Sequence, residues 1–179
     1  MINKDIEIII NKISIGDIES LKELYNEFNH AIYSLSFYML KNKQAAEDVT
    51  QEVFLKIWHN ANTYCKEKGN AKAWIMGIAR NESIDYMRKN KHEINSDFNE
   101  EFAIDNGIST AHEQVLSKIH IEEALSVLSE INRQIIVLHI MGDLTFRTVS
   151  KLMNMPLGTV VWKYQSSIKE LQKLLCKID

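Results

Sequence analysis

Proline and glycine are scarce in this chain of 179 residues, which has one proline, Pro156, and six glycines. Sandwiches and barrels of β-strands need many tight turns, and those turns are rich in these two residue types. Hydrophobic residues make up 45% of the chain, so it can form a packed core, and global disorder is disfavoured. The composition therefore favours an all-α protein.

Cysteine is also rare. Cys65 and Cys176 lie far apart and belong to no CxxC pair or His-Cys cluster, which is typical of two reduced thiols. The six histidines are scattered, and no pair has the spacing of a metal site. The chain also lacks GxGxxG, P-loop and HExxH motifs and a catalytic Cys-His spacing. We therefore expect no metal, no cofactor and no enzymatic activity.

Long apolar runs are missing as well. The run Ile8-Ile9-Ile10 follows acidic residues and is shorter than the apolar core of a signal peptide. No run approaches the roughly 20 apolar residues that span a bilayer. These absences predict a cytoplasmic protein.

Excess charge is absent overall, since the net charge is −3, but the acidic residues are unevenly distributed. Residues 93–117 contain no Lys or Arg and carry six acids: Glu93, Asp97, Glu100, Glu101, Asp105 and Glu113. The part from 93 to 109 is rich in Asn, Asp and Ser and has no sustained helical period. We interpret 93–109 as an acidic linker between two nearly neutral parts.

Helical periodicity dominates the part before the linker. Apolar residues recur every three or four positions through three segments. These segments are Asp17–Leu40, Gln44–Asn60 and Trp74–Arg88. They predict a compact bundle of at least three helices.

Capping signals dominate the part after the linker. Thr110-Ala-His-Glu113 has the pattern of a capping box, and Ser129 can cap a helix that runs to Met141. Thr145 can cap a short helix that ends near Met153, and the last helix runs from about Leu157 to Leu175. The last two helices fit either a DNA-binding helix-turn-helix or a plain helical hairpin.

The final helix has one face suited to DNA. Its predicted inward residues are Val160, Tyr164, Ile168, Leu171 and Leu175. Opposite them lie small, polar and basic residues that suit phosphate or base contacts in a major groove. They are Gly158, Thr159, Trp162, Lys163 and Ser166.

The stretch Met155-Pro-Leu-Gly-Thr-Val160 resembles the entry into the recognition helix of sigma domain 4. The flanking stretches Leu144–Phe146 and Lys169–Leu171 extend this resemblance, and Leu128–Leu138 resembles the preceding helix of that domain. The resemblance implies that this region reads the −35 promoter element. The chain departs from the family pattern at Arg147, which we include among the −35 candidates, and in the few basic residues of its last helix.

A second stretch, Ala45–Trp58, resembles the helix of sigma domain 2 that docks on the polymerase β′ subunit. Its pattern places an acidic, amide and apolar face opposite a buried stripe of Val49, Val53 and Ile57. The resemblance implies polymerase binding by four residues. They are Asp48, Gln51, Glu52 and Leu55.

A third stretch, Ala73–Lys89, resembles the helix that melts and binds the −10 element. Basic residues and aromatic residues alternate here, as capture of a single strand requires. The candidates are Lys66, Lys68, Asn70, Lys72, Trp74, Arg80, Asn81, Arg88 and Lys89. Trp74 is equally well interpreted as an anchor in the core.

Together these motifs resemble the sigma-70 family, and the short linker points to its extracytoplasmic-function group. The resemblance implies two helical domains, 1–92 and 110–179, joined by the linker 93–109. It also implies core RNA polymerase, through its β′ and β subunits, and promoter DNA as partners. An anti-sigma factor, which could be membrane-bound, is a further candidate partner. The rival interpretation is a stand-alone helix-turn-helix regulator that does not bind polymerase.

Overall fold

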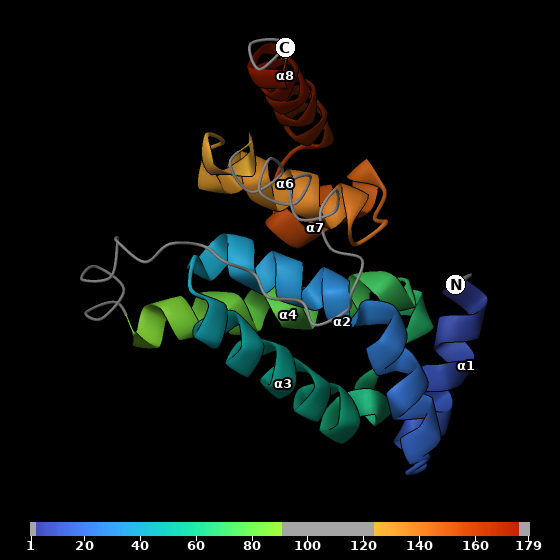
Figure 1. Ribbon diagram of the computed structural model, residues 1–179. Coiled ribbons are helices and arrows are strands. Elements are labelled where there is room, and N and C mark those ends of the chain that lie inside the picture. Colours follow the sequence, from blue (N-terminus) through green and yellow to red (C-terminus); the bar gives the residue numbers. More distant parts are fainter. Residues whose placement is uncertain (1–2, 91–123, 176–179) are drawn as a thin grey trace.

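The computed structural model describes residues 3–90 and 124–175. Across these two stretches every regular element is helical, which confirms the prediction of an all-α chain. Figure 1 shows α1 (Asn3–Ser14), α2 (Ile18–Leu40), α3 (Lys43–Asn60), α4 (Ala71–Lys89), α6 (Glu130–Ile140), α7 (Phe146–Met153) and α8 (Leu157–Leu175). Two short 3-10 turns, η1 (Ala61–Thr63) and η2 (Lys66–Lys68), connect α3 to α4.

Side-chain caps begin five of these helices. In each case a side-chain oxygen accepts a hydrogen bond from a backbone N–H two or three residues later, which satisfies a donor that the helix cannot. The caps are Asp17, Asn42, Asn70, Ser129 and Thr145. Each such cap typically stabilises a helix by about 1 kcal/mol, so the boundaries of these helices are encoded locally.

The N-terminal bundle (α1 to α4, residues 3–90) buries the apolar stripes that the sequence predicts on its second to fourth helices. The structure adds α1, which is not among the helices that the periodicity of the longer segments predicts. Ile6, Ile10 and Ile13 of α1 are fully or almost fully buried against the other helices. Their spacing of four and three is the helical signal in that segment.

The C-terminal helices (α6 to α8, with the preceding turn, residues 124–175) contain the expected pair α7 and α8. Asn154 takes a left-handed φ of 51° at the end of α7, and Ser150 Oγ donates to the Met155 carbonyl at 2.6 Å. Pro156 follows directly, so the chain turns sharply into α8. Val160 of α8 is fully buried, as the predicted inward stripe requires.

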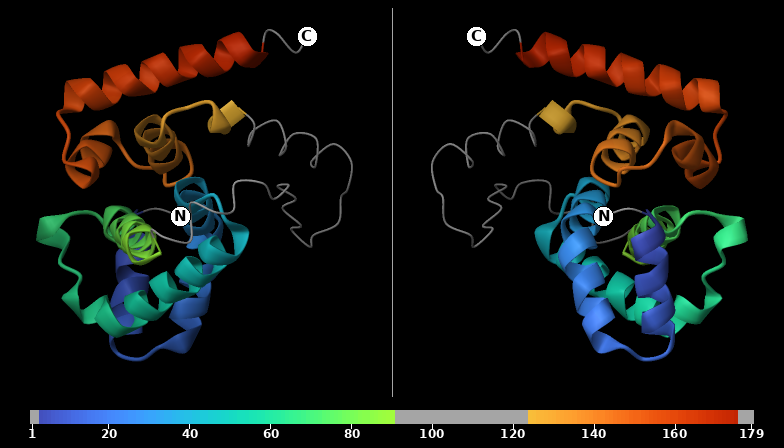
Figure 2. Two further views of the ribbon diagram at one scale, coloured as in Figure 1. Left: turned by 90° about the vertical axis from the view of Figure 1, so that its left-hand side faces the viewer. Right: turned by 90° about the vertical axis from the view of Figure 1, so that its right-hand side faces the viewer.

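The C-terminal helices pack on the N-terminal bundle instead of standing apart from it. Ile135 and Leu138 of α6, and Val149 of α7, belong to the same apolar core as the bundle. Figures 1 and 2 show α6 and α7 lying against α2 and α4, with α8 the helix farthest from the bundle. One face of the bundle is therefore covered by the C-terminal helices.

Arg133 of α6 connects the two parts. Its side chain is buried, at 4% exposure, and its guanidinium donates to the carbonyls of Leu125, Ser126 and Leu128 at 2.8 to 3.1 Å. It also donates from Nη1 to the carbonyl of Tyr38 in α2 at 3.1 Å. Burial lowers the pKa of Arg133, and these four acceptors compensate for the water that its charge has lost.

Two expectations fall outside the described residues: the acidic linker 93–109 and the helix start at Thr110–Glu113. Among the helices that are described, none is both long and apolar enough to cross a lipid bilayer.

Candidate functional site

The first candidate surface is the outer face of α3. Asp48, Gln51 and Glu52 are exposed or half-exposed, and the apolar side chain of Leu55 is 54% exposed. The opposite face of α3 is buried in the bundle core through Val49, Val53 and Ile57. Gln44 Nε2 donates to Asp48 Oδ1 at 3.1 Å, which orients that carboxylate along the helix surface. The result is a rigid face of acidic and amide groups around one exposed leucine.

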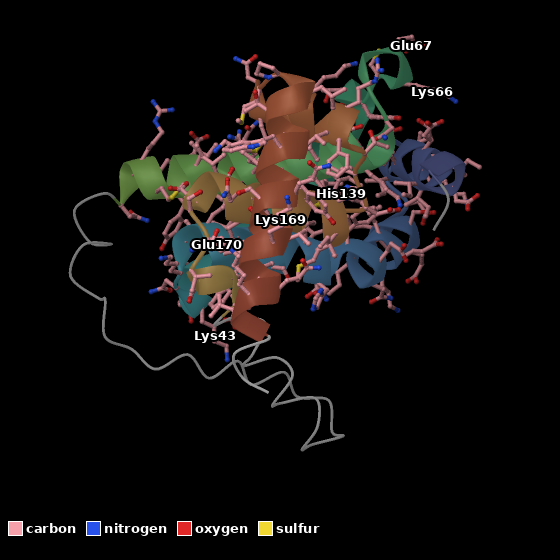
Figure 3. The ribbon with its side chains drawn as sticks, turned by 90° about the horizontal axis from the view of Figure 1, so that it is seen from above. Lys43, Lys66, Glu67, His139, Lys169 and Glu170 are labelled. Atoms are coloured by element: carbon pink, nitrogen blue, oxygen red, sulfur yellow. The ribbon has the colours of Figure 1, made fainter. Side chains whose placement is uncertain are left out.

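The second candidate surface begins at η2. Lys66 forms an ion pair with Glu7 of α1 at 2.9 Å, and this contact raises the pKa of Lys66. Asn70 Oδ1 accepts a hydrogen bond from the Ala73 amide at 2.7 Å, so its side chain caps α4. The side chain of Lys68 lies outside what the structure describes. Figure 3 shows Lys66 at the edge of the molecule, well apart from α8.

On α4 itself, two candidate basic residues face the C-terminal helices. Lys72 forms an ion pair with Asp143, with 15% of the Lys72 side chain and 80% of the Asp143 side chain exposed. The hydrogen bond from Lys72 lowers the pKa of Asp143. Arg80 Nε donates to Gln134 Oε1 of α6 at 3.2 Å, and burial lowers the pKa of Arg80. Both side chains are thus engaged by residues that lie far along the chain.

A glycine permits this close approach. A Cβ placed on Gly77 of α4 would lie 3.2 Å from Leu152 Cδ2 of α7, tighter than ordinary van der Waals contact. Gly77 lies between Lys72 and Arg80 in the sequence, on the covered side of α4. A Cβ at this position would require the Leu152 side chain to shift by a few tenths of an ångström.

The remaining −10 candidates lie on the open part of α4. Asn81, Arg88 and Lys89 are exposed, and Arg88 lies 3.6 Å from Asp85 in a surface ion pair. Trp74 is half-buried against the core, and its ring packs edge-on to Tyr64 with centroids 5.6 Å apart. Burial is the main cause that raises the pKa of Tyr64 to about 12, so its hydroxyl stays neutral. Trp74 thus packs against the core with part of its surface and leaves the rest exposed.

The third candidate surface lies on α7 and α8. Arg147 and Gly158 are exposed, and Trp162 is 64% exposed, which is unusual for a tryptophan. Thr159, Lys163 and Ser166 are half-buried. Lys163 Nζ donates to Asn132 Oδ1 of α6 at 3.4 Å and lies 5.9 Å from the centre of the Trp162 ring.

Four residues near these surfaces were not among the predicted sites. Gln134 and Asp143 bind the basic residues of α4, and their role carries no local sequence signal because their partners are 54 and 71 residues away. Lys151 of α7 and Gln165 of α8 are exposed beside Arg147 and Trp162. Lys151 follows Arg147 by four positions and Gln165 follows Trp162 by three, and residues at these spacings share a helix face. This spacing is the sequence signal that predicts them.

Comparison with known proteins finds matches to sigma factors. A profile described as Sigma-70 region 2 matches residues 24–93, which contain α3, α4 and most of α2. An ECF RNA polymerase sigma factor, SigK of Mycobacterium bovis BCG, is 25% identical over 183 aligned residues that cover 97% of this chain and 95% of SigK. Residues 24–93 thus carry a match to Sigma-70 region 2, and nearly the whole chain is similar to extracytoplasmic-function sigma factors.

Solved structures of sigma factors have the same fold as this one. The sigma factor RpoE of Bartonella quintana, in complex with the anti-sigma factor NepR, has a TM-score of 0.70 and 26% identity. The match covers 88% of this chain and 97% of the RpoE chain. CnrH in complex with the cytosolic domain of CnrY has a TM-score of 0.68 and 16% identity, and covers 97% of this chain and 98% of CnrH. The latter likeness concerns the fold alone.

Proposed function

We propose that this chain gives a bacterial RNA polymerase its promoter specificity. It is a sigma factor that binds core RNA polymerase and directs transcription initiation at promoters. The observation that carries this function is the match to sigma factors over 97% of the chain, together with the exposed acidic face of α3. The chain acts in the cytoplasm and is not itself an enzyme, since the chemistry of RNA synthesis belongs to the polymerase.

The outer face of α3 is the polymerase-binding surface in this proposal. Asp48, Gln51, Glu52 and Leu55 present charge, hydrogen-bonding groups and apolar area from one rigid helix. Such a face fits a basic helical partner, and the family resemblance names the β′ subunit. The family resemblance names the β subunit as a second partner. We assign residues 1–92 and 110–179 to these two domains, with 93–109 as the linker.

In this proposal α4 and the turn before it bind the −10 element. Exposed basic residues attract the phosphates of a single strand, and the ring of Trp74 offers a surface on which a base can stack. Lys72 and Arg80 are occupied by Asp143 and Gln134 in the structure. DNA and the C-terminal helices therefore compete for the same two side chains. Promoter opening requires α6 and α7 to leave α4.

In this proposal α7 and α8 bind the −35 element. Arg147 lies at the start of α7 and is exposed. Gly158 lies at the start of α8, and a Cβ placed on it would meet no heavy atom within 4 Å. Both positions therefore suit close approach of a DNA backbone. Trp162 is the large exposed side chain of this surface. The rival function, a regulator that never binds polymerase, leaves the exposed face of α3 without a role.

An anti-sigma factor is a further partner in this proposal. NepR, which is bound to RpoE, is described as an anti-sigma factor. Such a partner would hold the chain inactive until a signal releases it, whether it lies in the cytoplasm or at the membrane.

Binding to core polymerase tests the function directly. Replacing Asp48, Gln51 and Glu52 together by Ala should abolish co-purification with core polymerase and leave helical circular dichroism unchanged, because all three side chains lie on the outer face of α3. A matched control replaces two exposed acids and an exposed amide on α2, Glu19, Glu23 and Asn26, and should bind normally. Normal binding by the α3 variant would contradict this assignment. Failure of the unmodified chain to bind any core polymerase would favour the stand-alone regulator.

A further inference from the structure

The surface of α8 has three sides with different surroundings. Val160 and Ser167 are buried on the side that meets the rest of the C-terminal helices. A second side meets α6 through the hydrogen bond of Lys163 to Asn132. The third side is open, and its exposed residues follow one another at spacings of four, three and four. They are Gly158, Trp162, Gln165 and Lys169.

This open side of α8 is accessible while the C-terminal helices stay packed on the bundle. Figures 1 and 2 show α8 as the helix farthest from the N-terminal bundle. Figure 3 looks down on α8 and shows Lys169 on it, with no other helix above. A DNA duplex can therefore approach these residues from outside the molecule.

Gln165 lies in the N-terminal half of α8, and the N-terminal part of a recognition helix is the part that contacts base edges. It follows Leu157, the first residue of α8, by eight positions, or about 12 Å along the helix axis. That length matches the width of the major groove, roughly 12 Å. Residues further along, such as Gln172, are about 10 Å beyond Gln165 and leave the groove.

The chemistry of Gln165 selects one base. Its amide offers one acceptor and two donors, and this set pairs with N6 and N7 of adenine in the major groove. Within residues 3–90 and 124–175 the structure records no hydrogen bond from this amide, whereas Lys163 is already bound to Asn132. Trp162 has only one N–H donor, and Lys169 is suited to a phosphate.

We propose that Gln165 is a specificity-determining residue that reads one adenine of the −35 element. This inference rests on the proposed function of the chain as a sigma factor that contacts duplex DNA through α8. Trp162 packs beside the same base pair, and Lys169 contacts the backbone on the far side. The base preference at that single position is then set by the side-chain amide of residue 165.

The test uses core polymerase with the full chain and a promoter library in which the −35 region is randomised. Transcripts are sequenced together with the promoter variant that produced them. The unmodified chain should prefer A·T at one −35 position. Gln165→Ala should lower that preference about tenfold and leave the other positions unchanged, as loss of one bidentate base contact predicts.

Three further variants make the result specific. Gln165→Glu should shift the preference at that position toward C·G, because a carboxylate accepts a hydrogen bond from N4 of cytosine. Gln172→Ala and Gln172→Glu are matched controls, since Gln172 is exposed on the same helix seven residues later. They should keep the preference of the unmodified chain, which separates base reading from a general effect of charge.

A modified base then identifies the contact. Once the position is known, 7-deazaadenine at that base removes the N7 acceptor. It should weaken transcription by the unmodified chain about tenfold and leave Gln165→Ala unaffected. If Gln165→Ala transcribes with every base preference intact, the inference is wrong while the sigma function stands. If the unmodified chain directs no promoter-dependent transcription, the proposed function fails instead.

Discussion

The two helices proposed to read DNA, α4 and α8, differ in what covers them. On α4, Lys72 and Arg80 are bound by Asp143 and Gln134 of the C-terminal helices. On α8, Gln165 and Lys169 are exposed. Figure 3 shows no other described helix above Lys169. The surface proposed to capture single-stranded DNA is therefore partly closed, and the surface proposed to read the duplex is open.

This difference indicates an order of events. Duplex recognition by α8 requires no rearrangement within the described part of the chain. Strand capture by α4 requires the contacts of α6 and α7 with α4 to break first. Asp143 and Gln134 hold the closed arrangement by binding Lys72 and Arg80. When these contacts break, both cationic side chains become available to DNA, so opening of the protein and binding of the DNA strand are coupled.

The largest effect should come from Arg133, which ties the C-terminal helices to α2. Arg133→Ala leaves four buried or half-buried carbonyls without their donor, and we expect a loss of about 3 kcal/mol in unfolding free energy. The measurement is urea unfolding monitored by circular dichroism. Arg147→Ala removes an exposed arginine from α7 and should change the unfolding free energy by less than about 0.5 kcal/mol. Equal stability of the two variants would refute the connecting role of Arg133.

The open end of α4 should matter for promoter melting. Replacing Arg88 and Lys89 together by Ala removes two exposed cations that can follow the phosphates of the captured strand. Permanganate reactivity of unpaired thymines near −10 should fall several-fold, while polymerase binding persists. Undiminished reactivity would show that these cations are only a solvated surface.

Substitution of the two partners of the Lys72–Asp143 ion pair should have opposite effects on DNA binding. Asp143→Ala frees Lys72 and loosens α4 from the C-terminal helices, so the chain should bind a single-stranded −10 oligonucleotide up to about fivefold more tightly, as expected for a pair worth at most about 1 kcal/mol. Lys72→Ala loosens the same contact but removes the phosphate partner, and should weaken binding. Fluorescence anisotropy measures both. Equal changes in both variants would mean that Lys72 does not contact DNA.

A smaller effect should follow from pH. Lys72 lowers the pKa of Asp143 in the folded chain below the value of about 3.9 that an aspartate has in the unfolded chain. The Asp143 carboxylate therefore stabilises the folded chain above about pH 3.9, and this contribution is lost as the pH falls through the lower pKa of the folded state. The difference in melting temperature between the unmodified chain and Asp143→Asn should be present at pH 6 and vanish at strongly acidic pH. A difference that stays constant with pH would exclude the ion pair as its cause.

Local signals in the sequence predicted most of the individual helices. The stripe of Val49, Val53 and Ile57 determines which face of α3 is exposed, and the caps Ser129 and Thr145 place the starts of α6 and α7. These features depend on near neighbours along the chain, where periodicity and capping are informative.

Contacts between distant segments could not be predicted in this way. Lys72 and Asp143 are 71 residues apart, and each looks like an ordinary surface charge in its own helix or turn. Arg133 stands between two polar residues, Asn132 and Gln134, and nothing local shows that it reaches the Tyr38 carbonyl, 95 residues away. On α8, Val160, Tyr164, Ile168 and Leu171 of the predicted inward stripe pack in the apolar clusters. Only contact with α6 distinguishes the engaged Lys163 from the open Gln165.

The most direct test of the closed α4 surface is to lock it. Lys72→Cys and Asp143→Cys, in a chain with Cys65→Ser and Cys176→Ser, can be joined by a short reversible thiol cross-linker because the native side chains are in contact. Permanganate reactivity at −10 is then measured with core polymerase, before and after the cross-link is reduced. The same four-substitution chain without cross-linker gives the reference level. We expect no promoter opening by the locked chain and recovery to the reference level after reduction. Full opening by the locked chain would contradict the requirement that α6 and α7 leave α4.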